Sequence, residues 1–127
     1  MTRERLFRLV AERYGTEPEY PWLDSPEFAV LRHSLGAKWY ALVMKLPGKT
    51  LGLPGEGMVE ALNLKLDPAL VFILLEQPGF LPAWHMNKKH WITVLLDGSV
   101  PDELVEKLVD ESFSLTRAKM KKAQKPE

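Results

Sequence analysis

The 127-residue sequence predicts an α+β fold, a two-layer sandwich in which a mainly antiparallel sheet carries helices packed on one face. Three observations support this. Amphipathic segments with helical spacing lie near both ends of the chain, strand-like segments joined by short links lie between them, and strands do not alternate with helices in βαβ order. Short links imply antiparallel pairing of the strands. The length is that of a single domain, which we expect over residues 1–116, followed by a basic tail over residues 117–127.

The first expected helix covers residues 2–14, where apolar side chains recur at helical spacing and Gly15 marks the end. Residues 17–26 contain three prolines, which predicts an extended segment. We expect Tyr20 and Trp22 to anchor that segment on the core.

The next part of the chain predicts three strands. Residues 27–33 and 38–46 are rich in aromatic and branched apolar side chains, and residues 34–37 supply a hairpin turn between them. Residues 47–57 hold four glycines and two prolines, which predicts a loop. Leucines alternate with polar side chains over residues 59–66, which is typical of a half-buried strand.

A second helix is expected over residues 68–77, since a capping aspartate precedes it and a proline opens it. Its apolar run, residues 69–75, carries no charge, and a helix that is apolar all round must be covered on both sides. Either the loop over residues 47–58 covers it, or a partner protein or a second copy of the chain does. A strand over residues 90–96 and a helix over residues 101–115 complete the fold.

Composition excludes several classes of function. The absence of cysteine removes disulfides, cysteine-bound zinc, iron–sulfur clusters and thiol catalysis. Lysine and arginine together number 17, as do aspartate and glutamate, so no global field selects a charged partner. The longest apolar run is far too short to span a bilayer and no signal peptide is present, so we expect a cytoplasmic protein with no membrane contact.

Two local patterns suggest cofactors, and both are better explained without one. Gly48-Lys49-Thr50 matches the end of a phosphate-binding loop, but Val43 stands where that motif needs glycine, and no helix can follow promptly. His85 and His90 are five residues apart, which places them on opposite faces of a regular strand. We therefore expect no metal ion and no cofactor.

Residues 84–91 form the most unusual stretch, with two tryptophans bracketing two histidines, two lysines and an asparagine. Lysine neutralises phosphate, asparagine and histidine can bond base edges, and tryptophan can stack, so the mixture suits nucleic acid. In the alternative, Trp84, Met86 and Trp91 pack into the core while Asn87 and Lys88 form a solvated turn. The residues alone favour the second interpretation. The lysine-rich tail is either a further polyanion contact or simply solubilising.

Taken together, these segments resemble the MmcQ/YjbR family of small bacterial proteins. The similarity rests on residues 30–33, 38–44, 62–68, 82–94, 96–104 and 110–115, and most specifically on the block Trp84-His85-Met86-Asn87-Lys88-Lys89-His90-Trp91. The resemblance implies a compact α/β sandwich similar in layout to secretion chaperones, and a DNA-binding role through a double-wing motif. It offers no catalytic residues, so we expect no enzymatic activity.

Three hypotheses of function follow. If DNA is the partner, the matching polar positions are Arg32, His33, Lys38, Asn87, Lys88, Lys89 and His90. A protein-interaction or chaperone-like module would instead use the apolar helix over residues 68–77. A small-molecule-binding protein would have a cleft lined by His85, His90 and Trp91.

Overall fold

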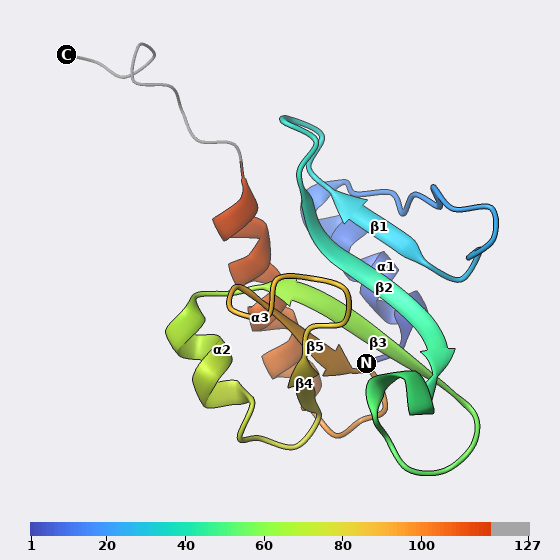
Figure 1. Cartoon of the computed structure of the whole chain (residues 1–127). Helices are drawn as coiled ribbons and strands as arrows, with labels where there is room; N and C mark the ends of the chain where they lie inside the picture. Colours follow the sequence, from blue (N-terminus) through green and yellow to red (C-terminus); the bar gives the residue numbers. More distant parts are fainter. Residues whose placement is uncertain (118–127) are drawn as a thin grey trace.

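The computed structural model describes residues 1–117. In chain order (Figure 1), its elements are α1 (Arg3–Tyr14), β1 (Ala29–Arg32), β2 (Trp39–Pro47), the 3-10 helix η1 (Gly48–Leu51), β3 (Met58–Lys65), α2 (Pro68–Leu74), β4 (Phe80–Pro82), β5 (Trp91–Leu95) and α3 (Asp102–Thr116). Apart from Arg117, the predicted basic tail lies outside the described residues.

The five strands form one sheet in the order β1-β2-β3-β5-β4, and every adjacent pair is antiparallel. The predicted α+β class with an antiparallel sheet is therefore confirmed. The sequence did not predict β4, which pairs with the outer edge of β5. Three residues are too few to produce an alternating pattern, so this edge strand depends on the pairing that β5 provides.

Local signals set the helix ends as expected. The Thr2 hydroxyl accepts a hydrogen bond from the Arg5 amide at 3.1 Å, and Gly15 closes α1 in the left-handed region at φ +68°. The Asp67 carboxylate accepts a bond from the Ala69 amide at 2.9 Å and so caps α2.

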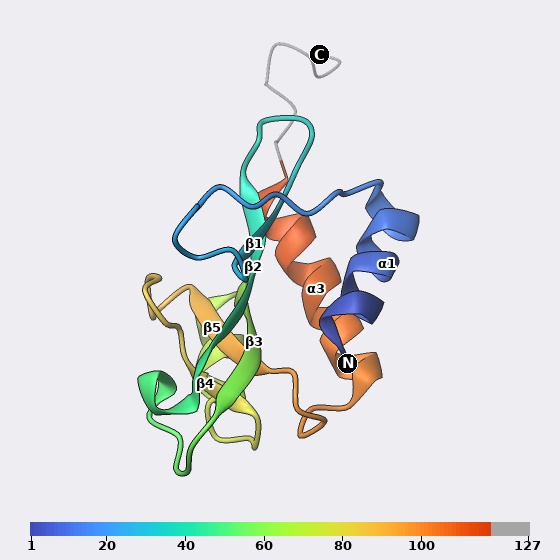
Figure 2. The same cartoon turned by 90° about the vertical axis from the view of Figure 1, so that its right-hand side faces the viewer.

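The helices share one face of the sheet, as predicted. Figure 2 shows the sheet close to edge-on, with α1 and α3 together on one side. Alternate side chains of the strands point into that layer and meet buried residues from all three helices. This core includes Leu6, Val10, Leu31, Tyr40, Val43, Leu62, Leu64, Val71, Leu74, Ile92, Val94, Val105, Leu108 and Val109.

Loops cover the opposite face of the sheet. A second buried cluster, which includes Leu42 and Met44 of β2, packs there against side chains from three connecting segments. These segments are residues 15–28, residues 48–57 and residues 83–90; η1 and the last of them lie on that side in Figure 2. Residues 15–28 also form one isolated β-bridge with the sheet, between Glu19 and Val30.

The helix α2 ends at Leu74, three residues earlier than expected. Val71 and Leu74 are buried, but Phe72 and Ile73 are 75% and 59% exposed. The loop after β2 does not cover this helix, because Leu51 packs on the other face of the sheet. One of the two expected covers for the apolar helix is therefore ruled out. In the described part of the chain, no helix combines the length and apolar character needed to cross a bilayer.

Candidate ligand-binding groove

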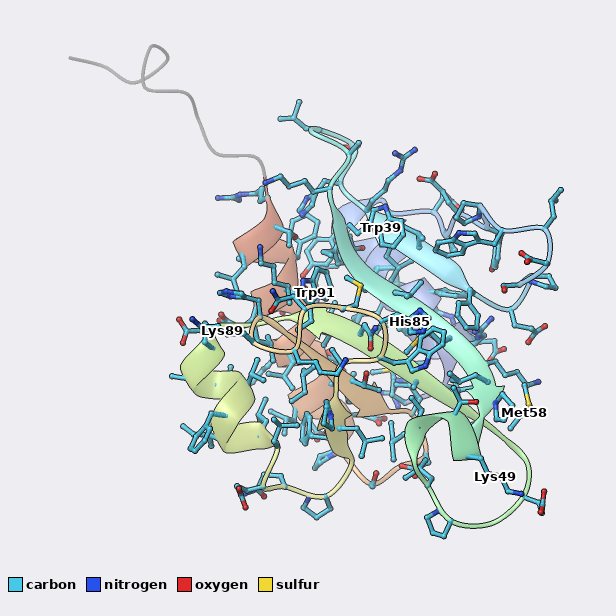
Figure 3. All side chains as sticks on the ribbon, in the orientation of Figure 1. Trp39, Lys49, Met58, His85, Lys89 and Trp91 are labelled. Atoms are coloured by element: carbon cyan, nitrogen blue, oxygen red, sulfur yellow. The ribbon has the colours of Figure 1, made fainter. Side chains whose placement is uncertain are left out.

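Aromatic side chains from three separate segments meet on the loop-covered face and surround a pocket of about 400 Å³, which we call the aromatic groove. It is lined by Trp22, Asp24, Ser25, Phe28, Trp39, Leu42, Trp84, His85 and Met86. Figure 3 shows Trp39 and His85 on this face, projecting from β2 and from the loop that crosses in front of the sheet.

Neighbouring rings of the groove stand nearly perpendicular. Trp22 and Trp39 have centroids 5.6 Å apart at 81°, Trp22 and Phe28 are 6.3 Å apart at 88°, and Phe28 and Trp84 are 5.6 Å apart at 73°. Such edge-to-face arrangements are favourable for aromatic pairs. The walls of the groove therefore support one another and form a continuous aromatic chain across the sheet.

A buried polar pair fixes one wall of the groove. Asn63 of β3 and Thr93 of β5 lie opposite each other in the sheet and have no exposed surface. The Asn63 amide donates to the Trp84 carbonyl at 2.9 Å, and the Trp84 amide donates to the Thr93 hydroxyl at 3.1 Å. Both backbone groups of Trp84 are thus held by the sheet below.

The backbone at His85 is strained. This residue has φ +56°, a left-handed conformation that residues other than glycine adopt at a cost of about 1–3 kcal/mol unless their side chain bonds locally. Its imidazole stacks on the Trp84 indole, with centroids 3.9 Å apart and planes 15° apart. The bonds to Trp84 and this stacking together hold the loop in a conformation it would not otherwise prefer.

The first predicted DNA-contacting group lies at the β1–β2 hairpin, and most of it is engaged within the chain. Arg32 donates to the Glu19 carboxylate at 2.6 Å. His33 is only 5% exposed and its Nε2 lies 2.9 Å from the Thr116 hydroxyl, and burial lowers the pKa of this imidazole. Lys38 is exposed in the hairpin turn.

The second predicted group lies in the loop before β5. The Asn87 side-chain oxygen accepts hydrogen bonds from the amides of Lys89 and His90 at 2.9 Å and 3.2 Å. The Lys88 ammonium donates to the Ala83 carbonyl at 2.8 Å. Asn87 and Lys88 therefore stabilise the loop itself, whereas the Lys89 side chain is exposed.

The two groups share one end of the sheet but do not meet. The strands β2 and β5 both begin at this end, and β3 runs between them. His85 joins the groove near Trp39, whereas Figure 3 places Lys89 at the far end of the loop, beside α2. His90 and Trp91, the other members of the predicted cleft, do not line the groove.

A second hollow, of about 430 Å³, lies beside the hairpin and is lined by Tyr14, Arg32 and His33 among others. Several of its polar side chains already have partners in the chain. Arg32 pairs with Glu19, and the Tyr14 hydroxyl donates to Asp110. We therefore take the aromatic groove as the candidate site. Within residues 1–117, no three histidine or acidic side chains are grouped as a metal site would require.

Sequence reasoning did not single out Trp22, Phe28 or Trp39 as site residues, and it expected Asn63 only to face away from the buried leucines. A polar residue stands inside each of two otherwise apolar strands, Asn63 in β3 and Thr93 in β5. This pattern could have pointed to a buried polar pair, but only the strand register shows that the two residues lie opposite each other.

Comparison with known proteins identifies the family. The family model described as YjbR matches residues 11–115. The chain belongs to the YjbR family. The matched range contains the whole aromatic groove and both of the predicted DNA-contacting groups.

Similar proteins and solved structures match most of the chain. The uncharacterized protein YyaQ of Bacillus subtilis is 42% identical over 117 residues, which are 92% of this chain and 99% of YyaQ. The uncharacterized protein YbdF of Escherichia coli O157:H7 is 35% identical over 76% of this chain and 70% of its own length. A crystal structure from Pseudomonas syringae has a TM-score of 0.90 at 44% identity, covering 92% of this chain and all of that one. A Deinococcus radiodurans crystal structure has a TM-score of 0.73 at 30% identity, covering 97% of this chain and 84% of its own. The YjbR sandwich is therefore common to this chain and these structures.

Proposed function

We propose that this YjbR protein is a non-enzymatic binding protein whose ligand occupies the aromatic groove. The observation that carries the proposal is the convergence of Trp22, Phe28, Trp39 and Trp84 from distant parts of the chain around one pocket of about 400 Å³. Concave sites rich in aromatic side chains, with a few polar groups at their edge, are typical of small-molecule binding.

Two features argue that the groove does more than cover the sheet. Its three tryptophans remain partly exposed, although a simple covering layer would gain most by burying them. In addition, the conformation of His85 is costly, and such strain is concentrated at functional sites. Both features are consistent with a surface prepared for an occupant.

The chemistry of the lining supports a non-catalytic role. Ser25, Asp24 and His85 all line the groove, but in the described part of the chain no hydrogen bond joins any two of them. A serine nucleophile needs a base within hydrogen-bond reach, and that base needs an orienting acid. The remaining lining groups supply stacking and dispersion rather than proton transfer.

Nitrogen-15 NMR of the full chain tests the proposal, because the four tryptophans include an internal control. Trp22, Trp39 and Trp84 line the groove, whereas Trp91 does not. In a screen of small aromatic and cationic compounds, we expect a ligand that shifts the first three indole N–H signals and leaves the fourth in place. If every compound that binds acts at Trp91 or at amides outside the groove, or if none binds, the proposal is wrong.

DNA binding, the role that the YjbR resemblance implies, is a second candidate. It is supported by the exposure of Lys38 and Lys89 at one end of the sheet, since affinity for DNA depends mainly on cations that can reach phosphates. Arg32, His33 and Lys88 contribute less to this candidate because each is engaged within the chain.

Fluorescence anisotropy with labelled duplex and single-stranded DNA tests this second candidate. If DNA binds, the double variant Lys38→Ala/Lys89→Ala should lower the slope of log affinity against log salt by about one for each lysine. Lys107→Ala is the control, because Lys107 is exposed on α3, which packs on the opposite face of the sheet from the loop that carries Lys89. Absence of binding at low salt, or an equal loss in the control, counts against DNA as the partner.

A further inference from the structure

We infer that the aromatic groove selects a small alkylammonium ion over neutral or anionic molecules of the same shape. The inference rests on the proposed function, because it names the ligand class of the same site. It follows from the kind of rings in the walls, the charge at the rim and the size of the hollow.

The walls are suited to a cation. Indole and phenyl faces attract positive charge within about 6 Å of the ring centroid, and tryptophan does so most strongly. Adjacent centroids along Trp39, Trp22, Phe28 and Trp84 are 5.6–6.3 Å apart, so a cation in the groove that lies within about 6 Å of one centroid can also lie within that distance of the next. Alkylammonium groups also bury their methyl or methylene surface against the same rings.

The charge of the lining residues also favours a positively charged ligand. Asp24 carries the one carboxylate among the lining residues, and no lysine or arginine is among them. An adjoining hollow of about 340 Å³ shares Asp24 and Trp84 with the groove and adds Glu27 and Lys45. The Lys45 ammonium lies 3.8 Å from the Glu27 carboxylate, so these two charges largely offset each other. Asp24 therefore remains as the charge that a ligand would meet.

The same charge distribution opposes a nucleotide. A phosphate in the groove would face Asp24, and neither Lys38 nor Lys89 is among the lining residues. An uncharged base could stack on the indoles, but its phosphates would have to leave the groove to find a cation. The volume of about 400 Å³ lies within the range of small-molecule pockets, which favours a free alkylammonium compound.

The test compares choline with its neutral isostere 3,3-dimethylbutan-1-ol and with adenine, each titrated into the full chain and followed by the four indole signals. We expect choline to shift the signals of Trp22, Trp39 and Trp84, with an affinity about tenfold higher than that of the neutral compound. Asp24→Asn should weaken choline several-fold and leave the neutral compound unchanged. The double variant Glu27→Gln/Lys45→Gln is the control and should leave both unchanged, because the two charges that it removes already offset each other.

Each other outcome overturns a specific statement. Equal affinity for choline and its isostere overturns the preference for a cation and leaves the groove as a binding site. Tighter binding of adenine at the groove also overturns it, in favour of base stacking. If no compound shifts the indole signals of Trp22, Trp39 and Trp84, both the cation preference and the proposed function of the groove as a binding site are wrong. If choline binds and Asp24→Asn has no effect, the role given to the carboxylate is wrong.

Discussion

The Thr93 hydroxyl donates a hydrogen bond to the side-chain oxygen of Asn63 inside the sheet, where neither residue has any exposed surface. Through this pair, two neighbouring strands hold the backbone of Trp84 on both of its polar groups. The Trp84 wall of the aromatic groove is therefore attached to the buried centre of the sheet rather than to other loops.

Substituting Asn63 by alanine should destabilise the protein strongly. The substitution leaves the Trp84 carbonyl and the Thr93 hydroxyl without their partner, and each such loss costs about 1–3 kcal/mol in a buried site. We expect the free energy of unfolding in urea to fall by about 2–4 kcal/mol. Asn87→Ala is the control, since its two bonds lie in an exposed turn and should cost about 1 kcal/mol or less. Equal losses in the two variants would contradict the role of the buried pair.

Alanine substitutions at Gly79 and Gly98 distinguish the stability cost of backbone strain from that of crowding. Both have φ near +90°, at +88° and +89°. A Cβ on Gly79 would lie 2.5 Å from a Val100 methyl and 2.6 Å from the Ser99 hydroxyl, whereas one on Gly98 meets nothing within 4 Å. Gly98→Ala should therefore cost about 1–2 kcal/mol from the left-handed backbone alone.

Gly79→Ala should cost about 1–3 kcal/mol more than Gly98→Ala, because the neighbours of Gly79 must also move. Thermal and urea unfolding of the two variants provides the comparison. Equal destabilisation would mean that the turn before β4 repacks without penalty and that the close approach of Gly79 to Val100 is unimportant.

Local signals account for the parts of the fold that the sequence predicted well. The ends of α1 follow from one capping hydroxyl and one glycine, and the alternation over β3 follows from which face each side chain occupies. These features need information from fewer than ten neighbouring residues. The short links between the strands predicted the sandwich, the family resemblance implied the same layout, and the antiparallel sheet confirms it.

The aromatic groove could not be predicted in the same way, because its walls come from residues 22–28, from Trp39 and from residues 84–86. Their meeting depends on strand order and on loops that cross the sheet. The polar positions proposed to contact DNA show a different difficulty, because residues that look alike in the sequence have different surroundings in the fold. Arg32 and Lys38 look equivalent in the sequence, but the extended segment brings Glu19 to Arg32, and the exposed turn leaves Lys38 at the surface.

The protein should lose stability below about pH 6.5 through His33. Burial lowers the pKa of this imidazole in the folded state, so the unfolded chain binds a proton more readily as the pH falls. The contribution of His33 is complete above the ordinary histidine pKa and is lost as the pH falls toward the lowered value. Urea unfolding at pH 7.5, 6.5 and 5.5 measures it. The His33→Gln variant should show a smaller loss over this range, and an unchanged slope would contradict the assignment.

The exposed apolar face of α2 should lead to self-association. Phe72 and Ile73 are 75% and 59% exposed, while Val71 and Leu74 on the same helix are buried in the core. An apolar patch of this kind gains free energy when a second copy covers it. We expect the sedimentation coefficient of the chain to rise with concentration, and the double variant Phe72→Ser/Ile73→Ser to remain monomeric with its free energy of unfolding changed by less than about 0.5 kcal/mol for each substitution. Leu23→Ser is the matched control, because Leu23 is 99% exposed on the other face of the sheet and its loss should not affect association. Were the unsubstituted chain monomeric at high concentration, Phe72 and Ile73 would require a different protein as their cover, and the argument for a second copy would fail.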